Sequence, residues 1–247
     1  LVVSYFFYYS NLTLDFVFFL LVAGFASLIF STKKEIILKP SSLLTLGVTF
    51  AFTVVSIFSL GLFILGGQRY VAEASYFQGI KAWREGRRDE ALDRLERAVR
   101  INPRLDLYWR ELGQAYIRQI SVVAERKDLS REEINQKIQR LINGAVNSAK
   151  TATDLNPENA INWQVRGFIY QNLIGVVEGV KDWALKCYQE AFRLEPTNPF
   201  YPTQMGISLL RETNFLPEER RGEKNALLSK AEEEFKKAIE LKPDYSN

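Results

Sequence analysis

One spacing recurs four times from residue 91 onward and constrains the fold more than any other feature of the chain. An alanine is followed by a second alanine seven residues later and by a proline five residues after that. The four sets are Ala91, Ala98 and Pro103; Ala145, Ala152 and Pro157; Ala184, Ala191 and Pro196; and Ala231, Ala238 and Pro243. Two alanines seven apart lie on one helix face, where small side chains allow close packing. A proline then stops the helix. The pattern predicts stacked helical units.

A second motif precedes the alanine pairs. The run Trp109, Leu112, Gly113 and Tyr116 has the pattern W-x-x-L-G-x-x-Y, and the run Trp163, Gly167 and Tyr170 repeats it with Arg166 in place of leucine. The first copy keeps Gly79 and the fourth keeps Gly206. Glycine inside a helix costs about 1 kcal/mol relative to alanine. Its recurrence therefore predicts a close contact between the two helices of each unit, and we interpret the aromatic residues as packing residues.

These motifs resemble the tetratricopeptide repeat (TPR) family over residues 71–243. The resemblance implies an all-α chain whose antiparallel helix pairs stack into a superhelix, or solenoid, with a concave groove. We expect a TPR domain at 68–247 with four degenerate repeats at about 72–105, 106–159, 160–198 and 199–245.

Insertions set three of these repeats apart from the family. A regular repeat has about 34 residues, and only the first copy has that length. The other copies carry insertions between their two helices. The insertion at 125–142 contains the capping-box pattern of Ser130 and Glu133 and predicts a longer helix. The charged insertion at 214–225 predicts a surface loop.

The first part of the chain, residues 1–67, has the composition of a membrane segment. Residues 41–68 contain no charged residue, and about 20 apolar residues cross the ~30 Å hydrocarbon layer. We expect two transmembrane helices at about 12–30 and 43–65, joined by a short basic loop at 31–40. The alternative for the second segment is a buried core helix. The lysines of the loop place it in the cytoplasm by the positive-inside rule. The TPR domain is then extracytoplasmic and fixed to a bacterial cell membrane, although Arg69, Lys81 and Arg84 follow the second span and weaken the rule.

The helices that carry the W-x-x-L-G motif present a second face that packing does not use. We predict that this face is the groove for a protein or peptide partner. Its residues are Tyr76 and Ile80 in the first copy; Arg110, Gln114 and Arg118 in the second; and Gln164, Phe168 and Asn172 in the third. A Lys/Asn clamp for a C-terminal carboxylate, known in some TPR proteins, has no counterpart at these positions. The alternative is a solvated face without a ligand.

The amino-acid composition argues against several kinds of chemical site. The chain has no histidine, which is the commonest general base and zinc ligand. Its single cysteine, Cys187, excludes an intramolecular disulfide and is interpreted as a buried apolar residue. We expect no cofactor and no metal, and the net charge of +3 does not favour nucleic acid. Without histidine or a catalytic motif we interpret this chain as a non-enzymatic piece, and no motif decides whether the parent protein is an enzyme.

Two functions fit these features. The first is a membrane-anchored TPR scaffold that mediates protein–protein interaction, with the lipid bilayer as its second partner. The second follows from residues 5–70, where the stretch Asn11–Phe16 before the repeats resembles the C-terminal end of bacterial O-antigen ligase/polymerase-type membrane proteins. That resemblance implies chemistry upstream of Leu1. The chain starts without methionine, so we expect a fragment or a processed product. A further repeat or a homo-oligomer contact is expected to cover the last repeat.

Overall fold

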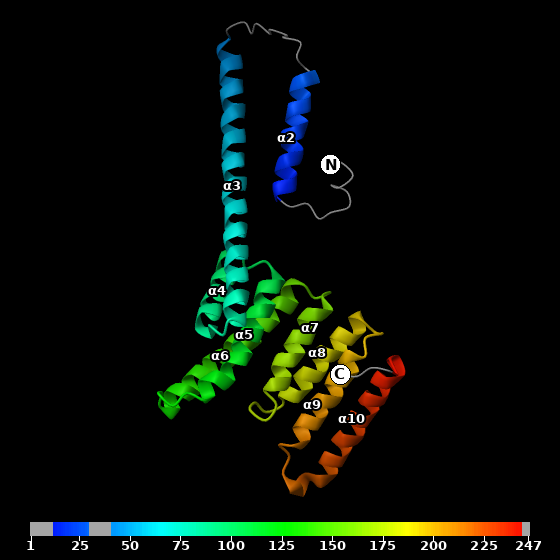
Figure 1. The fold of residues 1–247 in the computed structure, drawn as a ribbon. Coiled ribbons are helices and arrows are strands. Elements are labelled where there is room, and N and C mark those ends of the chain that lie inside the picture. Colours follow the sequence, from blue (N-terminus) through cyan, green and yellow to red (C-terminus); the bar gives the residue numbers. More distant parts are fainter. Residues whose placement is uncertain (1–11, 30–40, 244–247) are drawn as a thin grey trace. The chain divides into compact units, whose positions relative to one another are not determined.

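The computed structural model describes residues 12–29 and 41–243, and within these ranges all regular structure is helical (Figure 1). The helices are α2 (Leu12–Ile29), α3 (Ser42–Arg84), α4 (Arg88–Ile101), α5 (Asp106–Ala124), α6 (Arg131–Leu155), α7 (Ala160–Asn172), α8 (Val180–Leu194), α9 (Phe200–Thr213) and α10 (Arg221–Leu241), with a 3-10 turn at Glu218–Arg220. The chain divides into two compact units, Leu1–Phe58 and Ser59–Asn247.

The first unit contains α2 and the beginning of α3. Helix α2 lies where the first membrane span is expected, and α3 includes the whole of the second. Within the described ranges α3 is the helix that is long and apolar enough to cross a membrane, with a mean hydropathy of 2.4 over its most apolar window, none of which is buried. The expected basic loop at 31–40 lies outside the described residues. Two membrane crossings, and the domain boundary at residue 67, stay predictions.

The second unit is a row of helix hairpins (Figure 1). The last turns of α3 pair with α4, α5 pairs with α6, α7 with α8, and α9 with α10. This arrangement confirms an all-α, TPR-like helical repeat fold. All eight repeated alanines are buried, with exposed fractions of 4% or less. The alanine pairs therefore lie inside the packed array, where their small side chains are needed.

The proline of each repeat fixes where its second helix ends. Helices α4, α6, α8 and α10 are followed by the C-cap residues Asn102, Asn156, Glu195 and Lys242, each directly before the repeat's proline. In all four, the backbone N–H of the C-cap donates to the carbonyl of the second alanine four residues earlier. A residue before proline is pushed out of the helical region of backbone space. The fixed spacing of five residues from the second alanine to the proline therefore follows from the last hydrogen bond of the helix.

The repeated glycines lie where the two helices of a hairpin touch. A Cβ on Gly79 would come within 3.3 Å of the Ala91 carbonyl oxygen on α4, and a Cβ on Gly113 would lie equally close to the Ala145 carbonyl oxygen on α6. In the last two hairpins aromatic rings fill the space instead. Tyr188 would lie 2.9 Å from a Cβ on Gly167, and Phe235 would lie 2.7 Å from one on Gly206. The predicted close contact is present in every hairpin.

The predictions for the insertions at 125–142 and 214–225 have different outcomes. The capping box is confirmed, since Ser130 Oγ accepts from the Glu133 N–H at 3.2 Å and the Ser130 N–H donates to Glu133 at 2.8 Å. Helix α6 accordingly extends the second hairpin. The prediction of a loop at 214–225 is wrong at its end, because α10 already begins at Arg221. Leu227, which is buried against Leu209, anchors these first turns of α10 to the preceding helix.

Candidate functional site

The two groove residues predicted on α3 take part in packing. Tyr76 and Ile80 are half-buried against the cluster that includes Leu95 and Tyr108. The rings of Tyr76 and Tyr108 are 5.1 Å apart between centroids. Most of the surface of these two side chains therefore belongs to the junction between the first and second hairpins.

Arg110 is also tied into a junction. Its side chain is 14% exposed, lies 3.7 Å from Glu111 and donates to Asn162 Oδ1 at 3.4 Å. Asn162 is 1% exposed and donates to Asp106 on α5 at 2.7 Å and to the Ala152 carbonyl of α6 at 3.1 Å. Three helices thus meet at one buried amide, and sequence patterns gave no indication of it.

The carboxylate of Asp106 is the charged centre of this junction. Burial opposes its ionisation, but hydrogen bonds from Asn162 and Asn159 outweigh that effect and hold the pKa of Asp106 below its ordinary value. Asn159 donates to the same oxygen at 3.1 Å. The junction between the second and third repeats is therefore polar as well as apolar.

Three of the predicted groove residues do come together. Arg118 of α5 and Phe168 and Asn172 of α7 line a hollow of about 700 Å³ on the second unit. The remaining lining residues are Trp83 and Arg88 of the first hairpin, Ile117, Ile120 and Ser121 of α5, Ile138 and Ile142 of α6, and Leu173 and Val176, which follow α7. We call this feature the hollow. Gln114 borders it through the 3.0 Å bond that it accepts from Arg118, whereas Gln164 does not line it.

The hollow has an apolar floor and a basic edge. Phe168 is half-buried, while Val176 at the rim is 66% exposed. Arg88 lies with its guanidinium carbon 5.8 Å from the centroid of the Trp83 ring, and Arg118 is exposed. Two arginines and no acidic residue are among the residues that line it. The chemistry favours a ligand with an apolar group and a negative charge.

Asn172 is held in place from two helices. Its amide donates to the Phe168 carbonyl at 2.8 Å, and its Oδ1 accepts from Arg211 of α9 at 3.3 Å. Arg211 also donates to the Gln171 carbonyl at 3.2 Å. The polar end of the hollow is consequently fixed by the fourth repeat, which sequence reasoning did not connect with it.

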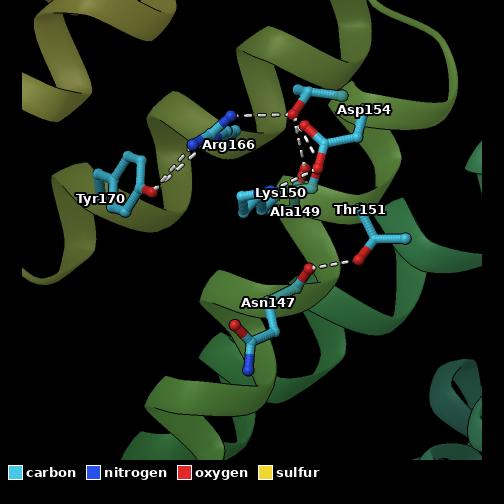
Figure 2. Close-up of polar contacts among 8 residues, drawn as sticks. Asn147, Ala149, Lys150, Thr151, Asp154, Arg166 and Tyr170 are labelled. Atoms are coloured by element: carbon cyan, nitrogen blue, oxygen red, sulfur yellow. Dashed lines mark hydrogen bonds and ion pairs between the residues drawn. The ribbon is translucent and has the colours of Figure 1, made fainter.

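Arg166, which replaces the leucine of the motif, has its own set of partners (Figure 2). It donates to Thr153 Oγ1 of α6 at 3.0 Å, and its guanidinium carbon lies 5.6 Å from the Trp163 ring and 5.7 Å from the Tyr170 ring. Thr153 is 1% exposed and also bonds to the Lys150 carbonyl at 2.8 Å. A hydrogen bond thus replaces the apolar contact that leucine makes, and no chemistry needs to be assigned to this arginine.

The two predicted packing tryptophans also bind the turns before them. Trp109 and Trp163 are half-buried. The Trp109 indole N–H donates to the Pro103 carbonyl at 2.8 Å, and the Trp163 indole N–H donates to the Pro157 carbonyl at 2.7 Å. Each tryptophan therefore connects one repeat to the proline that ends the previous one. The equal spacing from proline to tryptophan in both copies was the available sequence signal.

Neither a metal site nor a reactive thiol is found among the described residues. They contain no group of three or more His, Cys, Asp or Glu placed to hold a metal ion. Cys187 is 3% exposed, and burial raises the pKa of its thiol to about 12. At neutral pH this cysteine is a protonated, buried apolar residue, as its position in the repeat suggests.

Comparison with known proteins gives structural likenesses only. No protein-family model and no curated protein matches the sequence. Among solved structures, a crystal structure of MamA is 18% identical, with 73% of this chain and 83% of that chain covered and a TM-score of 0.49. TTC0263, a thermophilic TPR protein of Thermus thermophilus, is 21% identical, with 70% and 92% covered and a TM-score of 0.42.

A third similar structure is YrrB, described as a TPR protein with an unusual peptide-binding site. It is 16% identical, with 69% of this chain and 86% of that chain covered and a TM-score of 0.32. Such values add nothing to the fold that the hairpins themselves establish. The resemblance of residues 5–70 to O-antigen ligase/polymerase-type proteins finds no support in these comparisons.

Proposed function

We propose that the chain is a membrane-anchored TPR-like scaffold whose hollow binds an extended segment of a partner protein. The observation that carries the proposal is the lining of the hollow. Packing buries most of the apolar surface between the hairpins. In the hollow, however, Val176 is exposed and Phe168 is only half-buried, and both lie with Arg88 and Arg118 in the lining. Concave sites with an apolar surface and a few convergent polar groups are where proteins bind ligands.

The partner segment is inferred from the charges. With two arginines and no acid in the lining, an acidic side chain can pair with Arg118, and an apolar side chain can cover Phe168. Asn172, whose Oδ1 accepts from Arg211, can bond through its amide to the backbone of an extended peptide. The segment is thus a short acidic and apolar peptide rather than a nucleic acid or a basic tail.

Anchoring is the second part of the proposal. The charge-free run at 41–68 and the length of α3 support one crossing, and α2 supplies a helix for the other. The bilayer supplies the apolar surroundings that exposed residues such as Phe52 and Phe63 need. The basic loop at 31–40 favours an extracytoplasmic position for the repeats in a bacterial cell membrane. Alkaline phosphatase fused after Asn247 should be active in cells, and an inactive fusion that is nevertheless stable would reverse this orientation.

A peptide selection tests the hollow. The full chain is placed in phosphatidylcholine nanodiscs and a random peptide library is selected on it. Enriched peptides should combine an acidic with an aromatic or aliphatic residue. Arg118→Glu should weaken their binding at least about tenfold, since it turns an attraction into a repulsion. Arg97→Glu makes the same charge change at an exposed site on α4 outside the hollow and should leave binding unchanged. Equal loss in both variants would reject the hollow as the site.

A further inference from the structure

A second cavity, of about 710 Å³, lies between α3 and the turn that joins α4 to α5. We call it the α3 cavity. Its apolar lining includes Leu65, Phe77 and Leu105, which are 57%, 59% and 37% exposed. Arg69 from α3 and Arg104 from the turn supply its positive charge. The groove predicted from the sequence does not include this cavity, apart from Tyr76 in its wall.

The basic residues of the α3 cavity are not neutralised by the protein. Arg69 and Arg104 are exposed and form no ion pair with any residue that the structure describes. The amides of Gln68 and Asn102 also line the cavity, and Glu73 is its acidic member. The lining therefore offers two free cations, neutral hydrogen-bond donors and one acceptor carboxylate.

The place of the cavity along α3 identifies the ligand. Leu65 is the last residue of the expected span, and Arg69 follows one turn later, about 6 Å further along the helix at 1.5 Å per residue. The headgroup layer extends roughly 5–8 Å beyond the hydrocarbon on each side. Arg69 follows Leu62 by seven residues and Leu65 by four, so the three side chains share one helix face. An acyl chain on the leucines would place its phosphate at Arg69.

We propose that the α3 cavity binds the headgroup of an anionic phospholipid of the phosphatidylglycerol type. Arg69 and Arg104 hold the phosphate oxygens, the headgroup hydroxyls donate to Glu73, and the acyl chains lie on the exposed face of Leu62 and Leu65. The inference rests on the anchoring part of the proposed function, because the leucines must lie at hydrocarbon depth. It assigns to the first repeat a lipid contact, distinct from the peptide contact of the hollow.

The test is lipid binding by the purified full chain. Native mass spectrometry in a mild detergent measures retention of phosphatidylglycerol and of phosphatidylcholine over a concentration series. We expect preference for phosphatidylglycerol. The double variant Arg69→Gln/Arg104→Gln should weaken it about 30-fold, since each basic residue beside an anionic lipid changes affinity roughly fivefold. The matched control Arg131→Gln/Arg140→Gln removes two exposed charges from α6 and should retain wild-type binding.

Each other outcome overturns the assignment. Equal retention of the two lipids, or full binding by the Arg69/Arg104 variant, would show that the cavity is not the site. Displacement of the lipid by an equal concentration of inorganic phosphate would show an anion site without lipid specificity. Flotation with pure phosphatidylcholine vesicles separates the two proposals. A chain that does not float fails the anchoring proposal, whereas one that floats without preferring phosphatidylglycerol fails the lipid inference alone.

Discussion

Replacing Gly167 by alanine should destabilise the repeat array, although alanine is the better helix former. The new Cβ would meet the Tyr188 ring at 2.9–3.0 Å. That ring is 0% exposed, and its hydroxyl donates to Gln171 at 3.2 Å, so it has little room to move. Overpacking of this kind costs about 1–3 kcal/mol, against a helix gain of about 1 kcal/mol. We expect a net loss of up to about 2 kcal/mol.

Thermal unfolding of the full chain in detergent, followed by circular dichroism at 222 nm, measures this loss. For a domain of this size the midpoint should fall by up to about 8 °C. Gly222→Ala is the matched control, because Gly222 is in α10 with nothing within 4 Å of an added Cβ. It should raise the midpoint slightly. If Gly167→Ala raised the midpoint as much as Gly222→Ala does, the close contact between α7 and α8 would be refuted.

Three further predictions concern the buried polar groups. Asp106→Asn should cost stability at pH 7. Because the folded-state pKa of Asp106 is lowered, the difference in unfolding free energy between variant and wild type should close as pH falls below about 4; a difference constant with pH would contradict this. Tyr188→Phe leaves Gln171 Oε1 without its donor and should cost about 1–3 kcal/mol in urea unfolding. Cys187, with its thiol buried and its pKa raised to about 12, should react with a maleimide only on unfolding; rapid labelling of the native chain would be inconsistent with its burial.

The repeat architecture could be predicted because each element of it depends on local rules. The alanine pairs, the glycines and the prolines each act through helix packing or helix termination, and these effects have a fixed spacing. The capping box at Ser130 and Glu133 is equally local. The start of α10 at Arg221 was missed because the burial of Leu227 against Leu209, far apart in sequence, decides it.

The site was less predictable, because it depends on contacts between repeats. Helical spacing placed Tyr76, Arg110 and Arg118 on equivalent faces, but only Arg118 lines the hollow. Tyr76 packs against Tyr108, and Arg110 bonds to Asn162. These partners lie in the next repeat, and the separation of Arg110 from Asn162 along the chain also includes the insertion of the second repeat. Periodicity within one helix cannot supply that information.

The most direct test of the account is a charge exchange in the hollow. A peptide selected on the full chain in nanodiscs is synthesised with its acidic residue changed to lysine, and its affinity is measured for wild type and for Arg118→Glu. We predict that the altered peptide loses affinity for wild type and recovers most of it with Arg118→Glu, because the opposite charges are restored at the same place. Failure of the exchanged pair to recover, with both single changes weakening binding, would contradict the claim that the hollow binds the partner through Arg118.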